Sequence, residues 1–369
     1  MVRISSIRRP ALIEDGIRFM KHVFLINNHM MFLMSMKVIE HEDIAPVDVI
    51  LLGVRRYLFP PEIRQKFPNN FQYDFFDLTE FGDMRTLCRT ALFHPLKIGA
   101  VIKKTDAQLR GRLGGDKFQL YAPHSIGGNI EILISMRECE AVFFLEEGSL
   151  AYACTPENNI CPLTAKQRLF FCLLRILSGG RLGSLVRTHF AVDHPKFRGI
   201  YCAFDDAFRG FPQRRVIGSP FEPAAELPDD LHAIIVFDAG IVPDEQLRQS
   251  IEVACRYAAE VRHHQRIYYK FHPGQRKEKR DAYRRRFEEL SKEYGIYLSE
   301  LSDDIRLENI AMALKDKLDV FIICSSVGLY AERCGCNVFT SAARFVSGNP
   351  RLQRHYDLYG HIFRRYKEI

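Results

Sequence analysis

Three short polar motifs in this chain carry side chains that could do acid–base chemistry or bind a phosphate group. Each motif follows a run of apolar residues of the kind that forms a buried strand. Side chains at the carboxyl ends of parallel strands gather at one edge of a sheet, which is where α/β proteins bind ligands. In chain order the motifs are Glu146-Glu147-Gly148, His272-Pro273-Gly274 and Ser325-Ser326.

The first motif places two carboxylates next to each other after the apolar residues 141–145. A carboxylate beside a second one is harder to ionise, so its pKa rises and it can act as a general base. Gly148 allows the sharp backbone turn that such a position requires. The pair therefore predicts a site of proton abstraction.

The other two motifs predict a site for a phosphate group. Histidine titrates near neutral pH, so His272 can protonate a departing phosphate or stabilise its charge. Ser325 and Ser326 precede a predicted helix over 327–333. Their hydroxyls would add to the free backbone N–H groups that bind phosphate at a helix N-terminus.

Each motif is weak when it is taken alone, because the same short pattern recurs elsewhere in the chain. Only one copy of each follows a convincing buried strand, in the order carboxylates, chain break, histidine, serines. The second copies are Glu14-Asp15-Gly16, His194-Pro195 and Ser5-Ser6.

The sequence that must position these motifs alternates short apolar runs with longer amphipathic stretches, as βαβ units do. Several runs are continuous in Val, Ile and Phe, which favours parallel strands covered on both faces. A helix is predicted from about Asp244. The predicted strands span 22–26, 47–52, 98–102, 117–121, 140–145, 199–203, 233–237, 266–270, 296–298, 320–324 and 338–340.

A chain of 369 residues is too long for one ordinary core and suits two domains. The break between them is predicted at 208–230, where four prolines and two glycines interrupt regular structure. The sequence therefore predicts an α/β protein with a first domain at 1–207 and a second at 231–369. The last helix of the second domain could pack back on the first.

Composition and charge are those of a globular protein with a basic excess. The net charge is +7, and residues 262–289 hold ten Lys or Arg against four acidic residues, a net charge of +6. Cys172, Cys255 and Cys324 lie in apolar runs, where cysteine behaves as a small core residue. Polar residues interrupt the apolar stretch 23–39, so we expect neither a signal peptide nor a membrane span. We expect a cytoplasmic protein with reduced thiols.

The motifs and their order resemble those of the bacterial sialyltransferases and polysialyltransferases of GT-B fold, which share D/E-D/E-G, HP and Ser-rich motifs. Here they read Phe-Leu-Glu-Glu-Gly-Ser, Tyr-Lys-Phe-His-Pro-Gly and Ile-Cys-Ser-Ser-Val-Gly. The segment 305–310 resembles the family segment whose glutamate binds the CMP ribose, which places that role on Glu308. The family usually has a proline near that glutamate, where this chain has Arg306. The resemblance covers about 22–340 and is weak through 163–195.

The resemblance implies two Rossmann-like domains facing a central cleft and an inverting transfer of sialic acid from CMP-sialic acid to a glycan hydroxyl. The family carries its base on the first acidic residue of the motif. That implies Glu146 as the base and Glu147 as its support. His272 would protonate or hydrogen-bond the departing phosphate, and Ser325 and Ser326 would hold it.

Further residues and partners follow from the same resemblance. Pro273, Gly274 and Glu308 would complete the CMP-sugar site, and Lys270 could add positive charge near the phosphate. No cofactor or metal is expected, because the donor has one phosphate linkage. The acidic pairs Asp205-Asp206, Asp229-Asp230 and Asp303-Asp304 lie in turn-like or linker contexts.

Several alternatives remain open from the sequence. A Kdo transferase would use CMP-Kdo with the same leaving group, and another GT-B enzyme would use a UDP- or GDP-sugar. The basic segment 276–286 could bind nucleic acid, but nothing else in the chain resembles a nucleic-acid module. In a sialyltransferase that segment could hold a polyanionic acceptor during capsule synthesis. It could equally face the inner membrane during lipooligosaccharide synthesis.

Overall fold

The computed structural model of the chain describes residues 20–54, 59, 61–67, 70–72, 95–113, 115–125, 128–160, 164–181, 188–237, 242–271, 275–302 and 305–369. These residues form two compact units. The first lies within Met1–Glu147, Thr155–Asp205 and Gly210–Ile217, and the second within Gly148–Cys154, Asp206–Arg209 and Gly218–Ile369. Gly148–Cys154, which precedes the predicted break at 208–230, thus belongs to the second unit, as does Asp206–Arg209, which overlaps the start of that break.

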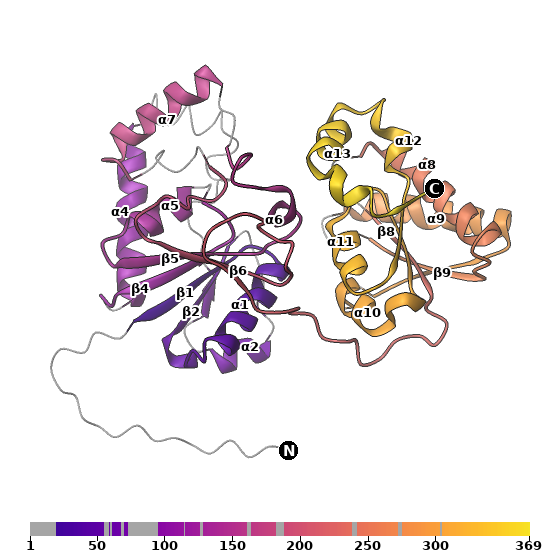
Figure 1. Ribbon diagram of the computed structural model, residues 1–369, viewed down its shortest axis with the longest axis horizontal. Coiled ribbons are helices and arrows are strands. Elements are labelled where there is room, and N and C mark those ends of the chain that lie inside the picture. Colours follow the sequence, from indigo (N-terminus) through magenta and orange to yellow (C-terminus); the bar gives the residue numbers. More distant parts are fainter. Residues whose placement is uncertain are drawn as a thin grey trace, which may run out of the picture. The chain divides into compact units, whose positions relative to one another are not determined.

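The first unit is built on a parallel sheet of seven described strands in the order β3-β2-β1-β4-β5-β6-β7 (Figure 1). Strand numbers increase from β1 to β3 toward one edge of the sheet and from β4 to β7 toward the other. The direction in which the chain adds strands therefore reverses between β1 and β4. The strands are β1 (Lys21–Ile26), β2 (Val49–Gly53), β3 (Asn70–Gln72), β4 (Phe118–Ala122), β5 (Cys139–Leu145), β6 (Phe197–Cys202) and β7 (Arg214–Val216).

Helix α1 covers one face of this sheet and closes its core. Asn28 is the N-cap of this helix, and its side chain accepts a hydrogen bond from the Met31 N–H at 2.8 Å. Its buried Met31, Met34 and Val38 belong to one apolar cluster with Phe24 of β1 and Phe143 of β5. The helices of this unit are α1 (His29–His41), η1 (Pro46–Asp48), α2 (Pro61–Lys66), α4 (Pro95–Leu113), α5 (Gly128–Ser135) and α7 (Ala165–Leu177).

The second unit has a parallel sheet of six described strands in the order β10-β9-β8-β11-β12-β13, which reverses between β8 and β11 (Figure 1). The strands are β8 (Ala233–Val236), β9 (Arg266–Lys270), β10 (Tyr297–Glu300), β11 (Asp319–Ile322), β12 (Asn337–Thr340) and β13 (Lys367–Glu368). The helices are α6 (Leu150–Ala153), α8 (Asp244–Glu260), α9 (Lys277–Tyr294), α10 (Leu307–Leu314), η2 (Lys315–Lys317), α11 (Ser326–Arg333), α12 (Ala342–Val346) and α13 (Pro350–Phe363).

The predicted architecture of two Rossmann-like parallel sheets is confirmed, as are the helices from Asp244 and over 327–333. One predicted strand is wrong, because residues 98–102 lie inside helix α4. A short apolar run does not distinguish a strand from a buried helical turn. Here Leu109 and Leu113 continue the apolar spacing for three more turns, and both are buried.

The expectation for the thiols is wrong at one position. Cys255 and Cys324 are buried, as predicted, but Cys172 is exposed on helix α7. The apolar run around Cys172 covers the whole circumference of a helix, and only part of that circumference packs on the domain. Among the helices that the structure describes, none combines the length and the hydropathy needed to cross a bilayer.

Helix α11 lies unusually close to the second sheet, and Gly328 allows this approach. A Cβ atom added at Gly328 would lie 2.3 Å from Ile322 Cδ1 on β11 and 3.4 Å from Val338 Cγ1 on β12. The missing side chain therefore sets the distance between the helix and the sheet. Because Ser325 and Ser326 lie at the start of α11, that distance also fixes their position.

We predict that Gly328→Ala lowers the free energy of unfolding by about 1–3 kcal/mol, since Ile322 must leave its preferred rotamer. The matched control is Gly360→Ala on α13, where an added Cβ meets no atom within 4 Å. That change should stabilise its helix by roughly 0.5–1 kcal/mol. Thermal unfolding followed by circular dichroism measures both, and equal stabilisation by the two variants would contradict the close packing.

Candidate functional site

Three polar side chains meet at the carboxyl edge of the first sheet, beside the point where its strand order reverses. Asn27 directly follows β1, and His124 and Glu147 are each the second residue after their strands, β4 and β5. Asn27 Nδ2 donates to Glu147 Oε2 at 3.0 Å. His124 Nε2 lies 3.9 Å from Glu147 Oε1. Parallel pairing of three neighbouring strands thus brings together residues that are far apart in the sequence.

The two carboxylates of the first motif have different surroundings. Glu146 is fully buried, and its Oε2 accepts the Ala203 N–H at 2.8 Å. Its own N–H donates to the Tyr201 carbonyl at 3.1 Å, which continues the pairing of β5 with β6. The Glu147 side chain keeps 19% of its surface exposed. Of the two carboxylates, that of Glu147 is therefore the accessible one in this structure.

Gly148 has the backbone conformation predicted for it. Its φ angle is 152°, which glycine adopts far more easily than residues with a side chain. The turn comes directly after the carboxylate pair. It also marks the residue at which the chain passes into the second unit.

The group around Glu147 has the composition of a site that handles hydroxyl groups. A carboxylate next to an imidazole can accept a proton, and an amide can orient the donor of that proton. Asn27 Oδ1 is buried without a hydrogen-bond partner among the described residues, so a bound hydroxyl could donate to it. The sequence prediction missed Asn27 and His124. Both follow predicted strands, so the rule that found Glu147 could have found them as well.

In the second unit, the two serines lie beside the corresponding point of strand reversal. Ser325 follows β11 and caps α11, where its Oγ accepts the Val327 N–H at 3.3 Å. Ser326 is the first residue of the helix and is exposed. The first backbone N–H groups of a helix carry partial positive charge that favours an anion. In this structure Ser325 itself accepts two of them, from Val327 and Gly328. The serine pair therefore lies at a helix N-terminus, where its hydroxyls could add to the attraction for a phosphate.

Lys270 and Glu308 lie at the same end of this unit's sheet. Lys270, the last residue of β9, is buried rather than solvated, and its Nζ donates to the Ser302 carbonyl at 2.5 Å. Glu308 lies in the first turn of α10 and is partly buried. Burial raises the pKa of the Glu308 carboxyl, while the positive charges of Arg306 and Lys270 act in the opposite direction.

A histidine that the sequence prediction missed lies close to the serines. His355 of α13 lines a small cavity together with Ser149, Ser325 and Ser326. Burial lowers the pKa of His355, and a hydrogen bond with the Cys324 backbone opposes this shift. The cavity measures about 10 Å³, about the space that one water molecule needs.

His272, Pro273 and Gly274 lie outside the residues that the structure describes, directly after β9 and Phe271. Their predicted roles therefore stay predictions. The second HP pair can be compared, because it is described. His194 accepts the Lys196 N–H at 3.2 Å in a turn before β6, so it lies at the amino end of a strand.

The basic segment 276–286 forms the start of α9, and several of its cations form ion pairs with neighbouring carboxylates. Lys279 pairs with Asp244 of α8, and Arg284 pairs with Glu300 of β10. Exposed cations without an ion pair among the described residues are Arg276, Lys277 and Arg285. The further ion pairs of 262–289 are Arg262–Asp319, Arg266–Asp230, Arg284–Asp281, Arg286–Glu252 and Arg286–Glu289.

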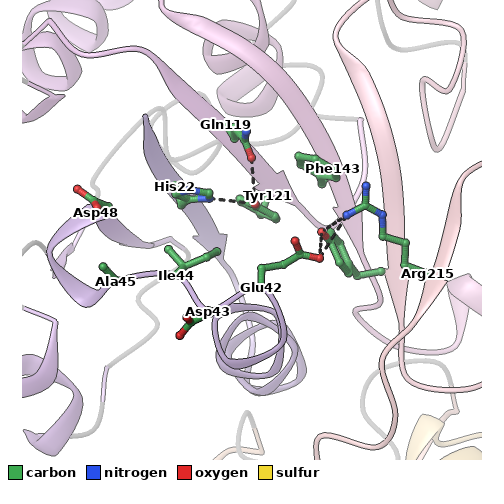
Figure 2. A pocket seen from close by; sticks show the side chains of 11 residues that line it. His22, Glu42, Asp43, Ile44, Ala45, Asp48, Gln119, Tyr121, Phe143 and Arg215 are labelled. Atoms are coloured by element: carbon green, nitrogen blue, oxygen red, sulfur yellow. Dashed lines mark hydrogen bonds and ion pairs between the residues drawn. The ribbon is translucent and has the colours of Figure 1, made fainter. Parts of the chain in front are cut away.

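A larger hollow in the first unit lies beside the end of α1 and contains none of the predicted residues (Figure 2). Its volume is about 530 Å³. Glu42 accepts hydrogen bonds from Tyr201 at 2.8 Å and from Arg215 at 3.2 Å. Burial raises the pKa of Tyr201 and lowers that of His22, so both groups are neutral at pH 7. Its lining residues are His22, Glu42, Asp43, Ile44, Ala45, Asp48, Gln119, Tyr121, Phe143, Tyr201 and Arg215.

Two residues of the acidic pairs named above make contacts within the described part of the chain. Asp206 pairs with Arg333, and Asp230 accepts the Tyr268 hydroxyl at 2.7 Å. Within the described part of the chain, no group of three or more His, Cys, Asp or Glu side chains is arranged to hold a metal ion.

Among solved structures, the chain is similar to a sialyltransferase from Photobacterium damsela, with a TM-score of 0.51 and 11% identity over 92% of this chain and 79% of that one. It is also similar to the glycotransferase of kitacinnamycin, with a TM-score of 0.48 and 9% identity over 95% and 86%. A UDP-GlcNAc 2-epimerase from Methanocaldococcus jannaschii gives a TM-score of 0.45 and 11% identity over 92% of each chain.

Comparison of the sequence with protein-family models gave no match, and comparison with curated proteins gave none. The two parallel sheets and the similarity to the Photobacterium damsela sialyltransferase together define the GT-B fold, as the sequence predicted.

The two serines should differ in what they contribute to stability. Ser325→Ala removes the N-cap of α11, so we expect a loss of about 0.5–2 kcal/mol in the free energy of unfolding. Ser326→Ala is the matched control, because its side chain is exposed, and its effect should stay within about 0.5 kcal/mol. Urea unfolding measures both. Equal effects would contradict the cap.

Proposed function

We propose that this chain is an inverting sialyltransferase that moves sialic acid from CMP-sialic acid to the hydroxyl of a glycan acceptor. The observation that carries this proposal is the position of the carboxylate pair and of the serine pair. Each lies at the carboxyl edge of its own sheet, near the point where the strand order reverses. Such edges are where open α/β sheets bind ligands. The fold shared with a sialyltransferase supports the proposal.

In this proposal the carboxylate pair supplies the base. The family resemblance assigns proton abstraction to Glu146 and support to Glu147. Glu146 is fully buried and its Oε2 accepts the Ala203 N–H, so in this proposal the carboxylate must become accessible to meet the acceptor hydroxyl. Glu147 already faces a hydroxyl-binding group of Asn27 and His124. Substitution of each carboxylate in turn distinguishes these two roles.

The donor is held by residues of the second unit. The N-terminus of α11, Ser325 and Ser326 bind the phosphate of CMP, and His272 protonates or hydrogen-bonds it as it departs. Glu308 binds the ribose hydroxyls as a carboxylate. Lys270, fixed by the Ser302 carbonyl, adds positive charge at the same end of the sheet. We propose that no metal is needed, because these groups can balance the charge of a single phosphate.

The acceptor is proposed only as a glycan hydroxyl. Ion pairs on α9 reduce the charge that the basic segment could offer to a polyanion. The proposal therefore covers the addition of one sialyl residue. Product mass distinguishes that outcome from chain extension, as a capsule polymerase would produce.

The donor is tested by incubating the full chain with CMP-sialic acid, CMP-Kdo or a UDP-sugar and a panel of glycan acceptors, followed by mass spectrometry. We expect transfer from CMP-sialic acid alone, unchanged by EDTA. Transfer from CMP-Kdo or a UDP-sugar instead would replace the proposed donor. Activity that EDTA abolishes would contradict the metal-free mechanism. Steeply salt-dependent binding of RNA or DNA without turnover would favour a nucleic-acid-binding protein.

The base is tested by Glu146→Gln and Glu147→Gln, each an isosteric loss of charge. We expect Glu146→Gln to lower kcat by roughly 10²–10⁴-fold while CMP binding changes little, because only proton transfer is lost. Glu147→Gln should lower kcat by less. Glu157→Gln, at an exposed residue, is the control. Full activity in Glu146→Gln together with loss in Glu147→Gln would move the base to Glu147.

A further inference from the structure

Helix α7 carries two apolar stripes on opposite sides. Phe171 and Leu174 lie three residues apart on one side of the helix and are buried, with exposed fractions below 9%. This side packs the helix against its own unit, in which α7 contacts α4 (Figure 1). One apolar stripe is all that the packing of a surface helix requires. The second stripe therefore calls for a separate explanation.

The second stripe faces solvent. It consists of Leu169, Cys172, Leu173 and Ile176, which have the i, i+3, i+4, i+7 spacing of one helix face. Leu169 is 73% exposed and Ile176 is 76% exposed. Ile160, which precedes the helix, is 64% exposed. Exposed apolar side chains that gather in this way mark a surface that binds a partner.

The charge in the segment that carries this stripe has one sign. The segment 158–192 contains five Lys or Arg residues and no Asp or Glu. Arg168 and Arg175 lie about two helical turns apart beside the stripe, and both are exposed. An amphipathic helix with an apolar face and basic flanks is typical of a segment that lies in the interface of an anionic membrane.

A second copy of the chain fits this surface less well than a bilayer does. A two-fold contact would bring the same face of both copies together, and with it Arg168 and Arg175 of each. The same segment of the second copy, 158–192, contains no acidic side chain with which these arginines could pair. Anionic lipid offers both an apolar interior for the stripe and negative headgroups for the arginines.

We propose that α7 is a membrane-docking helix, which places its exposed stripe, Leu169, Cys172, Leu173 and Ile176, in the surface of an anionic bilayer. The inference does not depend on the proposed donor, because docking is measured without a sugar nucleotide. It concerns helix α7, which carries none of the candidate site residues.

The test is flotation of the full chain with vesicles of phosphatidylcholine alone or mixed with phosphatidylglycerol. We expect binding to the mixed vesicles, weaker binding to phosphatidylcholine, and release at high salt, because salt screens the arginines. Leu169→Ser with Ile176→Ser should weaken binding by about tenfold or more, since it removes apolar surface from the bilayer. Arg168→Gln with Arg175→Gln should remove the preference for phosphatidylglycerol.

Matched controls lie on the other unit. Val261→Ser with Leu358→Ser changes two exposed apolar residues, and Arg351→Gln with Arg354→Gln changes two exposed arginines. Both should bind vesicles like the unaltered chain. No binding to mixed vesicles, or equal loss in the control variants, would overturn the proposal. A dimer in analytical ultracentrifugation that Leu169→Ser with Ile176→Ser dissociates would also overturn it, and would assign the stripe to a second copy.

Discussion

Parallel pairing of the central strands is the constraint on which the candidate groups of each unit depend. Because every strand of a parallel sheet runs the same way, all the residues that follow the strands lie at one edge. Where the strand order reverses, the connections leave in opposite directions and open space for a ligand. In the first unit this point lies between β1 and β4, next to Asn27 and His124. In the second it lies between β8 and β11, which Ser325 follows.

Packing then decides how firmly each group is held. Gly328 allows α11 to lie against β11 and β12, and the Ser325 cap orders the first turn of that helix. In the carboxylate pair, Glu146 is buried and its side chain accepts the N–H of Ala203, the residue after β6, whereas the side chain of Glu147 remains accessible. The proposed transfer needs both properties, since a rigid frame positions the groups and an open side admits the substrate.

Net charge by sequence position is a poor guide to the charge that a partner meets. The segment 262–289 has a formal charge of +6, yet ion pairs with acidic residues on α8, β10 and β11 hold much of it. The segment 158–192 has a smaller excess and contains no acidic residue of its own.

The sequence by itself determined the fold class, because apolar runs and their spacing specify parallel strands and covering helices. It determined the strand-end motifs as well, since position after a buried strand is a local property. It failed at 98–102, where a short apolar run fits a helix and a strand equally. Only the tertiary structure decided that Glu146 is buried while Glu147 meets Asn27 and His124, and that Cys172 faces solvent. Burial and contact depend on residues that are distant in the chain, and no local pattern records them.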